Sequence, residues 1–260
     1  MHVMILLFAL VMGISDVLAQ PLRIDTLVVI APGDTNRFWV QIPEGYSPTQ
    51  PPALLSWWHG YGGSRFELLG AAGWADSLNS RGWIGACHTG GPTTHHYNVQ
   101  MAQDHCRIML DWIMERYPFS RDSVYMMGSS MGAAAPFIWH NNNCGVMSYP
   151  LAAGAGGSPI LDCELRQHQY IDSGHINNAM IENFGGIPDT SEAVDFEYHR
   201  YSAVHLADTS QSMHFNSLHL PCYARWGTTD STWSALPSCC SIPTTQRGSP
   251  FTVYSCVACR

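Results

Sequence analysis

The sequence alternates between short apolar runs and segments with helical periodicity, and this alternation limits the possible folds more than any other feature. Strands are expected at 53–60, 83–90, 123–128, 148–157 and 222–227, helices at 65–82, 97–117 and 131–141, and an antiparallel opening pair at 27–31 and 37–43. The helix at 97–117 repeats apolar residues at steps of three and four, and Pro118 ends it. Strands that alternate with helices form a mostly parallel sheet with helices on both faces, so we predict an α/β fold.

Charge composition excludes two classes of protein. Only 12% of the 260 residues are charged, about half of the usual share, and 46% are hydrophobic, which argues against a disordered chain. The net charge is −8 and no run of Lys or Arg occurs, so nothing neutralises the phosphates of a nucleic acid. We therefore expect a globular domain with a sizeable core and no nucleic-acid partner.

The first 19 residues are expected to be a signal peptide. Residues 3–14 form an apolar run that is too short to span a bilayer, and Val17 and Ala19 are the small residues that signal peptidase accepts. The alternative is a buried core element, because the segment before the apolar run holds only His2 and no Lys or Arg. Cleavage after Ala19 predicts a secreted or periplasmic chain of residues 20–260 without membrane association.

Cysteine and histidine spacing indicates no metal or cofactor site. The nine cysteines are an odd number, so at least one lacks a partner within the monomer, and their spacing does not reveal the pairing. Cys256 and Cys259 form a C-x-x-C motif without a second half, and the histidines are scattered along the chain. We expect neither a metal nor a cofactor; the alternatives are a zinc or redox site at the C-x-x-C motif and a metal bound by the histidines.

A Gly-Ser-Ser-Met-Gly motif at 128–132 lies between an expected strand and an expected helix. In this context the G-x-S-x-G pattern places its central serine, Ser130, on a sharp turn where the hydroxyl is exposed and oriented. Gly128 and Gly132 leave space where side chains would collide with neighbouring backbone. We predict that Ser130 is a nucleophile. The alternative is a small-residue turn in an inert sheet, and Ser129 lies off the central position of the motif.

A His-Gly motif in the stretch "WWHGYGGS" ends an earlier strand. A loop of this kind directs backbone N–H groups toward a developing oxyanion, and the N-terminus of the helix after Ser130 does the same. The backbone N–H groups of Tyr61 and Met131 are the predicted oxyanion donors. His59 and Gly60 are expected to support the loop, with His59 pointing away from the serine.

An aspartate follows the last expected strand in the stretch "ARWGTTDST". Asp230 comes three residues after the glycine that ends this strand, at the same sheet edge as Ser130. A carboxylate in this place orients a histidine and stabilises its imidazolium form. The alternative role for Asp230 is an Asx-type turn cap.

Together these motifs resemble the α/β-hydrolase family over about residues 27–233. The stretch "MAQDHCRIMLDWIMERYPFSRDSVYMMGSSMG" is similar to the secreted esterase branch that includes feruloyl esterases and polyhydroxybutyrate depolymerases. The resemblance implies hydrolysis of a carboxylic ester through an acyl-enzyme, with a small-molecule or polysaccharide-linked ester as substrate. A peptidase on the same fold and a catalytically inactive binding protein are the alternatives.

Two segments depart from this family pattern. The stretch 158–220 is polar and breaks the alternation of strands and helices. It is expected to be an inserted cap or lid; the alternative is a long irregular loop.

The tail at 234–260 is atypical because no histidine follows Asp230, whereas the family order is nucleophile, acid, histidine. Three accounts remain: an altered or truncated reading frame, a non-catalytic relative, or a base supplied by His95, His96 or the cap. Without a base, residual acceleration is about 10³–10⁴ over water.

Overall fold

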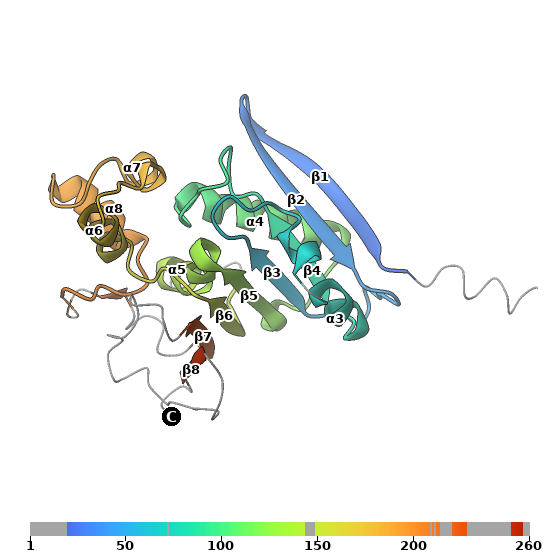
Figure 1. Ribbon diagram of the computed structural model, residues 1–260. Coiled ribbons are helices and arrows are strands. Elements are labelled where there is room, and N and C mark those ends of the chain that lie inside the picture. Colours follow the sequence, from blue (N-terminus) through green and yellow to red (C-terminus); the bar gives the residue numbers. More distant parts are fainter. Residues whose placement is uncertain are drawn as a thin grey trace, which may run out of the picture.

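One sheet organises the part of the chain that the computed structural model describes, which comprises residues 20–71, 73–143, 149–208, 210, 212–213, 220–227 and 251–256. The sheet has eight strands in the order β1-β2-β4-β3-β5-β6-β7-β8 (Figure 1). The strands are β1 (Leu22–Ala31), β2 (Asp34–Ile42), β3 (Leu54–Trp58), β4 (Ile84–His88), β5 (Val124–Ser129), β6 (Ala153–Gly157), β7 (Cys222–Gly227) and β8 (Phe251–Cys256).

The central strands are parallel and the edges are antiparallel. Strands β4, β3, β5, β6 and β7 form consecutive parallel pairs. The β1–β2 hairpin pairs antiparallel with β4 through β2, and β8 pairs antiparallel with β7. The predicted α/β class and the antiparallel opening pair are confirmed, and the architecture is the α/β-hydrolase fold.

The helices follow the predicted order with one exception. They are α2 (Glu67–Gly70), α3 (Trp74–Ser80), α4 (Gln100–Arg116), α5 (Ala135–Asn143), α6 (Cys163–Asp172), α7 (Asn178–Phe184) and α8 (Glu192–Arg200), with two 3-10 helices, η1 (Arg121–Ser123) and η2 (Ser130–Ala134). The prediction of one helix over 65–82 was wrong, because α2 and α3 are separate. Gly73 precedes α3 with a φ of 73°, a left-handed conformation that interrupts a helix.

Both faces of the central sheet are buried by helices. Alternate side chains of β3 pack into the two different clusters on these faces. Leu54 and Trp58 pack into a cluster with residues of α4 and α5, whereas Leu55 and Trp57 pack into a second cluster with residues of α2 and α3. Successive side chains of a strand point to opposite faces, so a strand between two helical layers reads as a continuous apolar run. This burial fixes β3 and β5 at the centre of the molecule.

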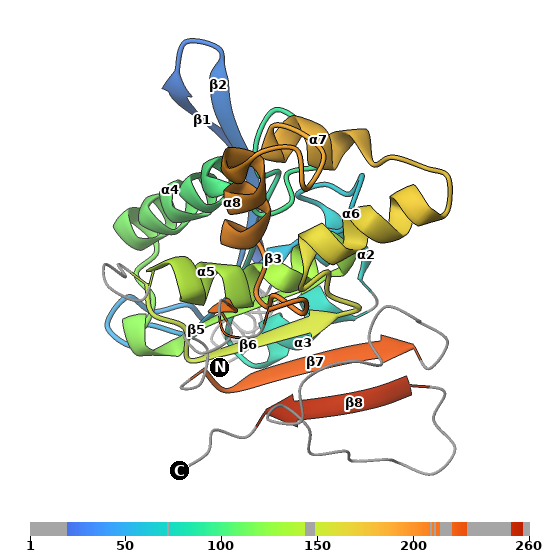
Figure 2. The ribbon, with the colours of Figure 1, turned by 90° about the vertical axis from the view of Figure 1, so that its left-hand side faces the viewer.

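The stretch 158–208, here named the cap segment, is helical. Helices α6, α7 and α8 lie together on the α5 side of the sheet (Figure 2). Asp162, Asn177 and Ser191 cap their N-termini by accepting backbone hydrogen bonds. Apolar residues of the cap segment, including Leu161, Met180, Phe184, Tyr198 and Val204, pack in one cluster with Met131 and Ile138 of η2 and α5. The alternative of an irregular loop was therefore wrong for 158–208, and the role as a lid stays a prediction.

Several predictions fall on residues that the structure does not describe: the signal peptide at 1–19, Asp230, and the tail at 234–260 apart from β8. Within the described ranges, every helix is too short or too polar to cross a bilayer.

Cys87, Cys106 and Cys163 are buried thiols that form no disulfide. Burial raises the pKa of the Cys106 thiol to about 12, which keeps it protonated and unreactive.

Candidate active site

Ser130 lies at the turn between β5 and η2, where the sequence places it. Strand β5 ends at Ser129 and η2 begins at Ser130. The φ of Ser130 is 49°, a left-handed value that is uncommon for a residue with a side chain, and its side chain is exposed. A residue holds such a backbone conformation only where its surroundings impose it, and such residues cluster at functional sites.

The two flanking glycines are required by close backbone contacts. A Cβ atom added to Gly128 would lie 2.5 Å from the carbonyl oxygen of Trp58, and one added to Gly132 would overlap the carbonyl oxygens of Trp58 and His59. The end of β3 therefore packs directly against the turn that carries Ser130, and no larger residue fits at either position.

The His-Gly loop lies at the same edge of the sheet as Ser130. Strands β3 and β5 are parallel neighbours, with Trp58 opposite Gly128. A Cβ atom on Gly60 would lie 3.7 Å from the Cβ atom of Ser130. Met131, which follows the serine, is fully buried, whereas the side chain of Tyr61 is 52% exposed. The loop thus lies beside Ser130, and the donor roles of the Tyr61 and Met131 N–H groups stay predictions.

Glu67 joins the two sides of this site, and the sequence reasoning missed it. Its carboxylate accepts hydrogen bonds from the Ser129 hydroxyl at 2.5 Å, from the Gly60 N–H at 3.0 Å and from the Trp57 indole N–H at 3.2 Å. One signal was available, because Glu67 is the only acidic residue between Glu44 and Asp76. A single carboxylate in an apolar stretch that follows a glycine loop is a candidate for such a role.

His59 supports the His-Gly loop through hydrogen bonds to backbone carbonyl oxygens, and these contacts occupy both of its ring nitrogens. Its Nδ1 lies 2.7 Å from the Gly60 carbonyl oxygen and its Nε2 lies 2.9 Å from the Thr89 carbonyl oxygen. Both ring nitrogens therefore face acceptors, and a neutral imidazole can donate to only one of them. The ring is fully buried, and the expectation that it points away from Ser130 stays a prediction.

His88 and His96 extend this buried layer. The ring of His96 lies 4.9 Å from that of His59 and 5.7 Å from that of Trp58, between ring centroids, and the ring of His88 lies 4.4 Å from that of Trp58. Burial, followed by the nearby His59, holds the pKa of both imidazoles well below the ordinary value. The His96 Nδ1 accepts the Asn98 N–H. His96 is fully buried, whereas Ser130 is exposed.

The loop at 94–98 connects the site to the cap segment. The ring of His95 lies 4.1 Å from that of Tyr61, between centroids. The Asn183 side-chain amide of α7 donates to the His95 carbonyl oxygen, and the Asn177 amide, at the N-cap of α7, donates to the Tyr97 hydroxyl, both at 2.7 Å. The cap segment therefore contacts residues that surround the predicted oxyanion loop.

The acid and the base are not assembled among the described residues. No histidine in those ranges is hydrogen-bonded to the Ser130 hydroxyl, and the histidines of α6 and α8 face Glu164 instead. Asp230 lies outside the described residues, so its role stays a prediction. The structure brings together Ser130, Gly128, Gly132, Met131 and the loop that carries His59, Gly60 and Tyr61.

Comparisons with known proteins identify the fold. No protein-family profile matches the sequence, and no curated protein matches it. Among solved structures, the chain is similar to an S-formylglutathione hydrolase from Agrobacterium tumefaciens, with 11% identity and a TM-score of 0.60, over 84% of this chain and 79% of that one. It is also similar to FphF, a fluorophosphonate-binding serine hydrolase from Staphylococcus aureus, with 16% identity and a TM-score of 0.51, over 70% and 72% of the two chains.

A third similar structure is a prolyl endopeptidase, with 14% identity and a TM-score of 0.50. The match covers 71% of this chain but only 27% of the endopeptidase, so it concerns one part of a longer protein. At these identities the three similarities concern the fold.

Proposed function

Because the chain has the α/β-hydrolase fold, we propose that it is a serine hydrolase that cleaves carboxylic esters through an acyl-enzyme. The observation that carries this proposal is the exposed Ser130, held at a φ of 49° between β5 and η2 with the Gly60 loop beside it. A left-handed backbone at a serine costs free energy, and such residues cluster at functional sites, so this conformation favours a catalytic turn over an inert one.

In the proposed reaction the Ser130 oxygen attacks the ester carbonyl carbon, and the alcohol leaves to give an acyl-serine ester. Water then hydrolyses this ester and releases the acid. The backbone N–H groups of Tyr61 and Met131 donate to the oxyanion of each tetrahedral intermediate, an interaction worth about 10²–10³ in rate for each donor. Asp230 is proposed to orient the histidine that accepts and returns the proton.

The proposed substrate class rests on the esterase resemblance of the sequence. We propose a small-molecule or polysaccharide-linked ester, reached by a chain that is secreted after removal of residues 1–19. A peptidase is the second candidate, since prolyl endopeptidase has a similar fold. An inactive binding protein is the third, because the described residues bring no base to Ser130.

The test combines covalent labelling with turnover. Purified chain is incubated with a fluorophosphonate probe and assayed on short-chain p-nitrophenyl esters and matching amides. We expect labelling and ester turnover in the native chain, loss of both in Ser130→Ala, and retention of both in Ser80→Ala, a control at an exposed position of α3. Labelling that persists in Ser130→Ala contradicts the assignment of the nucleophile. Absence of labelling and turnover in the native chain favours the binding protein, and faster amide cleavage favours the peptidase.

A further inference from the structure

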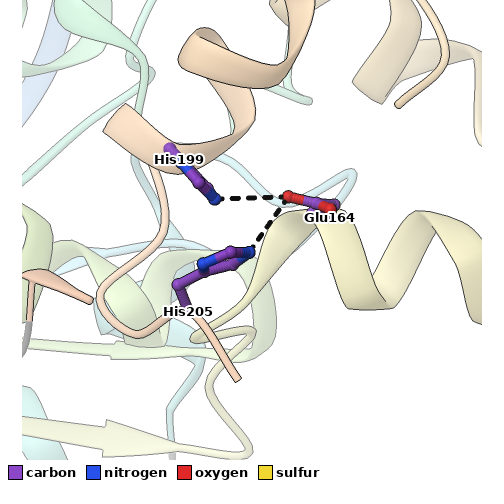
Figure 3. A group of neighbouring side chains, drawn as sticks. All are labelled: Glu164, His199 and His205. Carbon is purple, nitrogen blue, oxygen red and sulfur yellow. Dashed lines mark ion pairs between the residues drawn. The ribbon is translucent and has the colours of Figure 1, made fainter. Parts of the chain in front are cut away.

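Three side chains from distant parts of the cap segment meet at one point. Glu164 lies in the first turn of α6, His199 in the last turn of α8, and His205 in the stretch that follows α8 (Figure 3). The Glu164 Oε2 lies 3.5 Å from the His199 Nε2 and 3.4 Å from the His205 Nε2. The three potential ligand atoms all lie within 4.8 Å of one another.

The two imidazole nitrogens that face Glu164 are buried and unsatisfied. Among the described residues, neither the His199 Nε2 nor the His205 Nε2 has a hydrogen-bond partner, and His205 is only 8% exposed. A charged imidazolium–carboxylate hydrogen bond closes to about 2.7–2.9 Å, which is clearly shorter than these separations. The two imidazole rings lie edge to face with centroids 3.8 Å apart, so both Nε2 atoms face the same carboxylate. These separations leave room for a ligand that all three side chains share.

A hydrogen bond orients the ring of His205. Its Nδ1 lies 3.2 Å from the Asp208 carbonyl oxygen and donates to it, so Nε2 is the nitrogen that can bind a metal ion. A second-sphere hydrogen bond of this kind orients most metal-binding histidines.

Asp162 fixes the position of His205 relative to Glu164. The Asp162 carboxylate accepts the Leu165 N–H at 2.9 Å in the first turn of α6 and the Leu206 N–H at 2.8 Å next to His205. The two ligand-bearing segments are thereby held together by a buried side chain. The site is preorganised by contacts that do not involve the candidate ligands themselves.

We propose that Glu164, His199 and His205 bind one Zn²⁺ ion, with water as the fourth ligand. Two atoms that each lie about 2.0–2.1 Å from one ion at a tetrahedral angle are separated by about 3.3–3.4 Å, close to the two distances above. Two histidines and one glutamate are an established ligand set for Zn²⁺. The ion would link α6, α8 and the stretch after α8, and so stabilise the cap segment. This proposal is independent of the proposed function.

A neighbouring pair of residues provides the matched control. The His168 Nε2 lies 4.0 Å from the other Glu164 oxygen and 3.4 Å from an Asp189 oxygen. The side chains of His168 and Asp189 are 36% and 74% exposed, so water competes for the hydrogen bonds of both. His168→Ala removes an imidazole from the same helix face and leaves the three proposed ligands intact.

The experiment measures Zn²⁺ binding to the full chain after treatment with a chelator and dialysis. Competition with a chromophoric chelator is expected to give one tight Zn²⁺ ion per chain. Each loss of a proposed ligand, in Glu164→Gln, His199→Ala and His205→Ala, should weaken Zn²⁺ binding by more than about 100-fold. A residue that only supports a ligand contributes less than this. The control His168→Ala should weaken binding by less than about tenfold. The same affinity in the native chain and in His205→Ala would overturn the proposal.

Cysteine ligation and misfolding are tested separately. The Co²⁺ complex of the native chain should show the visible bands of a tetrahedral site without a thiolate-to-metal charge-transfer band, and such a band in the tight complex would overturn the assignment. In the native chain, Zn²⁺ should slow amide hydrogen exchange in α6 and α8 but not in α4. Unchanged exchange in α6 and α8 at saturating Zn²⁺ would contradict the site even if a variant failed to fold.

Discussion

The Glu67 carboxylate accepts the Ser129 hydroxyl hydrogen bond at 2.5 Å, so the residue before the proposed nucleophile is tied to α2. The same carboxylate binds the Gly60 N–H at 3.0 Å. Since Gly60 precedes the predicted donor Tyr61, one side chain sets the position of the His-Gly loop relative to the serine turn. We therefore expect Glu67 to affect the proposed reaction through these neighbours, as a positioning residue.

Glu67→Gln is expected to lower kcat by about tenfold with little change in KM. The carboxylate accepts three N–H or O–H groups, whereas an amide presents its own N–H₂ to at least one of them, which leaves a donor unsatisfied at a cost of about 1–3 kcal/mol. Steady-state kinetics on a p-nitrophenyl ester and urea unfolding measure the two effects. Glu44→Gln, at an exposed position, is the control, and wild-type kcat in Glu67→Gln would exclude the positioning role.

The oxyanion assignment is tested by two substitutions at one position. Tyr61→Pro removes the backbone N–H and is expected to lower kcat by about 10²–10³. Tyr61→Ala keeps the N–H and removes only a half-exposed ring, so kcat should stay within about threefold. Both proteins are checked by circular dichroism before kinetics. Equal kcat in the two variants would show that the Tyr61 N–H does not stabilise the transition state.

Gly132→Ala is expected to destabilise the protein by more than about 2 kcal/mol, because its Cβ atom would overlap the carbonyl oxygens of Trp58 and His59 and force the backbone to shift. Gly70→Ala is the control, since a Cβ atom there has no neighbour within 4 Å. In helix α2 that change should be neutral or stabilising by up to about 1 kcal/mol. Urea unfolding measures the stability of both variants. Equal stability of Gly132→Ala and Gly70→Ala would show that the serine turn tolerates a side chain at Gly132.

The buried histidines predict loss of stability in acid. Burial holds the pKa of His88 and His96 well below the ordinary value of about 6.5, which the unfolded chain keeps. Below about pH 6.5 the unfolded state therefore binds protons that the folded state does not, and the free energy of unfolding falls as the pH falls. Each histidine contributes a slope of up to about 1.4 kcal/mol per pH unit.

Urea unfolding between about pH 7.5 and about pH 5 measures this slope. His88→Leu removes one of the two histidines with a lowered pKa, His88 and His96, and should flatten the slope by up to about 1.4 kcal/mol per pH unit. His175→Gln changes an exposed histidine and should leave the slope as in the native chain. An unchanged slope in His88→Leu would show that His88 is protonated in the folded protein.

Local sequence was sufficient for the serine turn and for most of the elements that position it. An apolar strand, a G-x-S-x-G motif and a helical pattern are continuous in the chain, so β5, Ser130 and α5 follow from periodicity and from the small size of two glycines. The break between α2 and α3 did not follow in this way, because a glycine within a helical pattern is often tolerated and Gly73 takes a left-handed φ here.

Tertiary structure alone decided the contacts between distant residues. Glu67 meets Ser129 across 62 positions, and 35 positions separate Glu164 from His199, so no local spacing marks either group. Those contacts depend on which strands are neighbours and on how α6 and α8 pack over α5. The sequence by itself determined which residue is exposed on a sharp turn, because that is a property of a few consecutive residues. Only the packing of the sheet and the cap segment decided which carboxylate supports that turn and which imidazoles face Glu164.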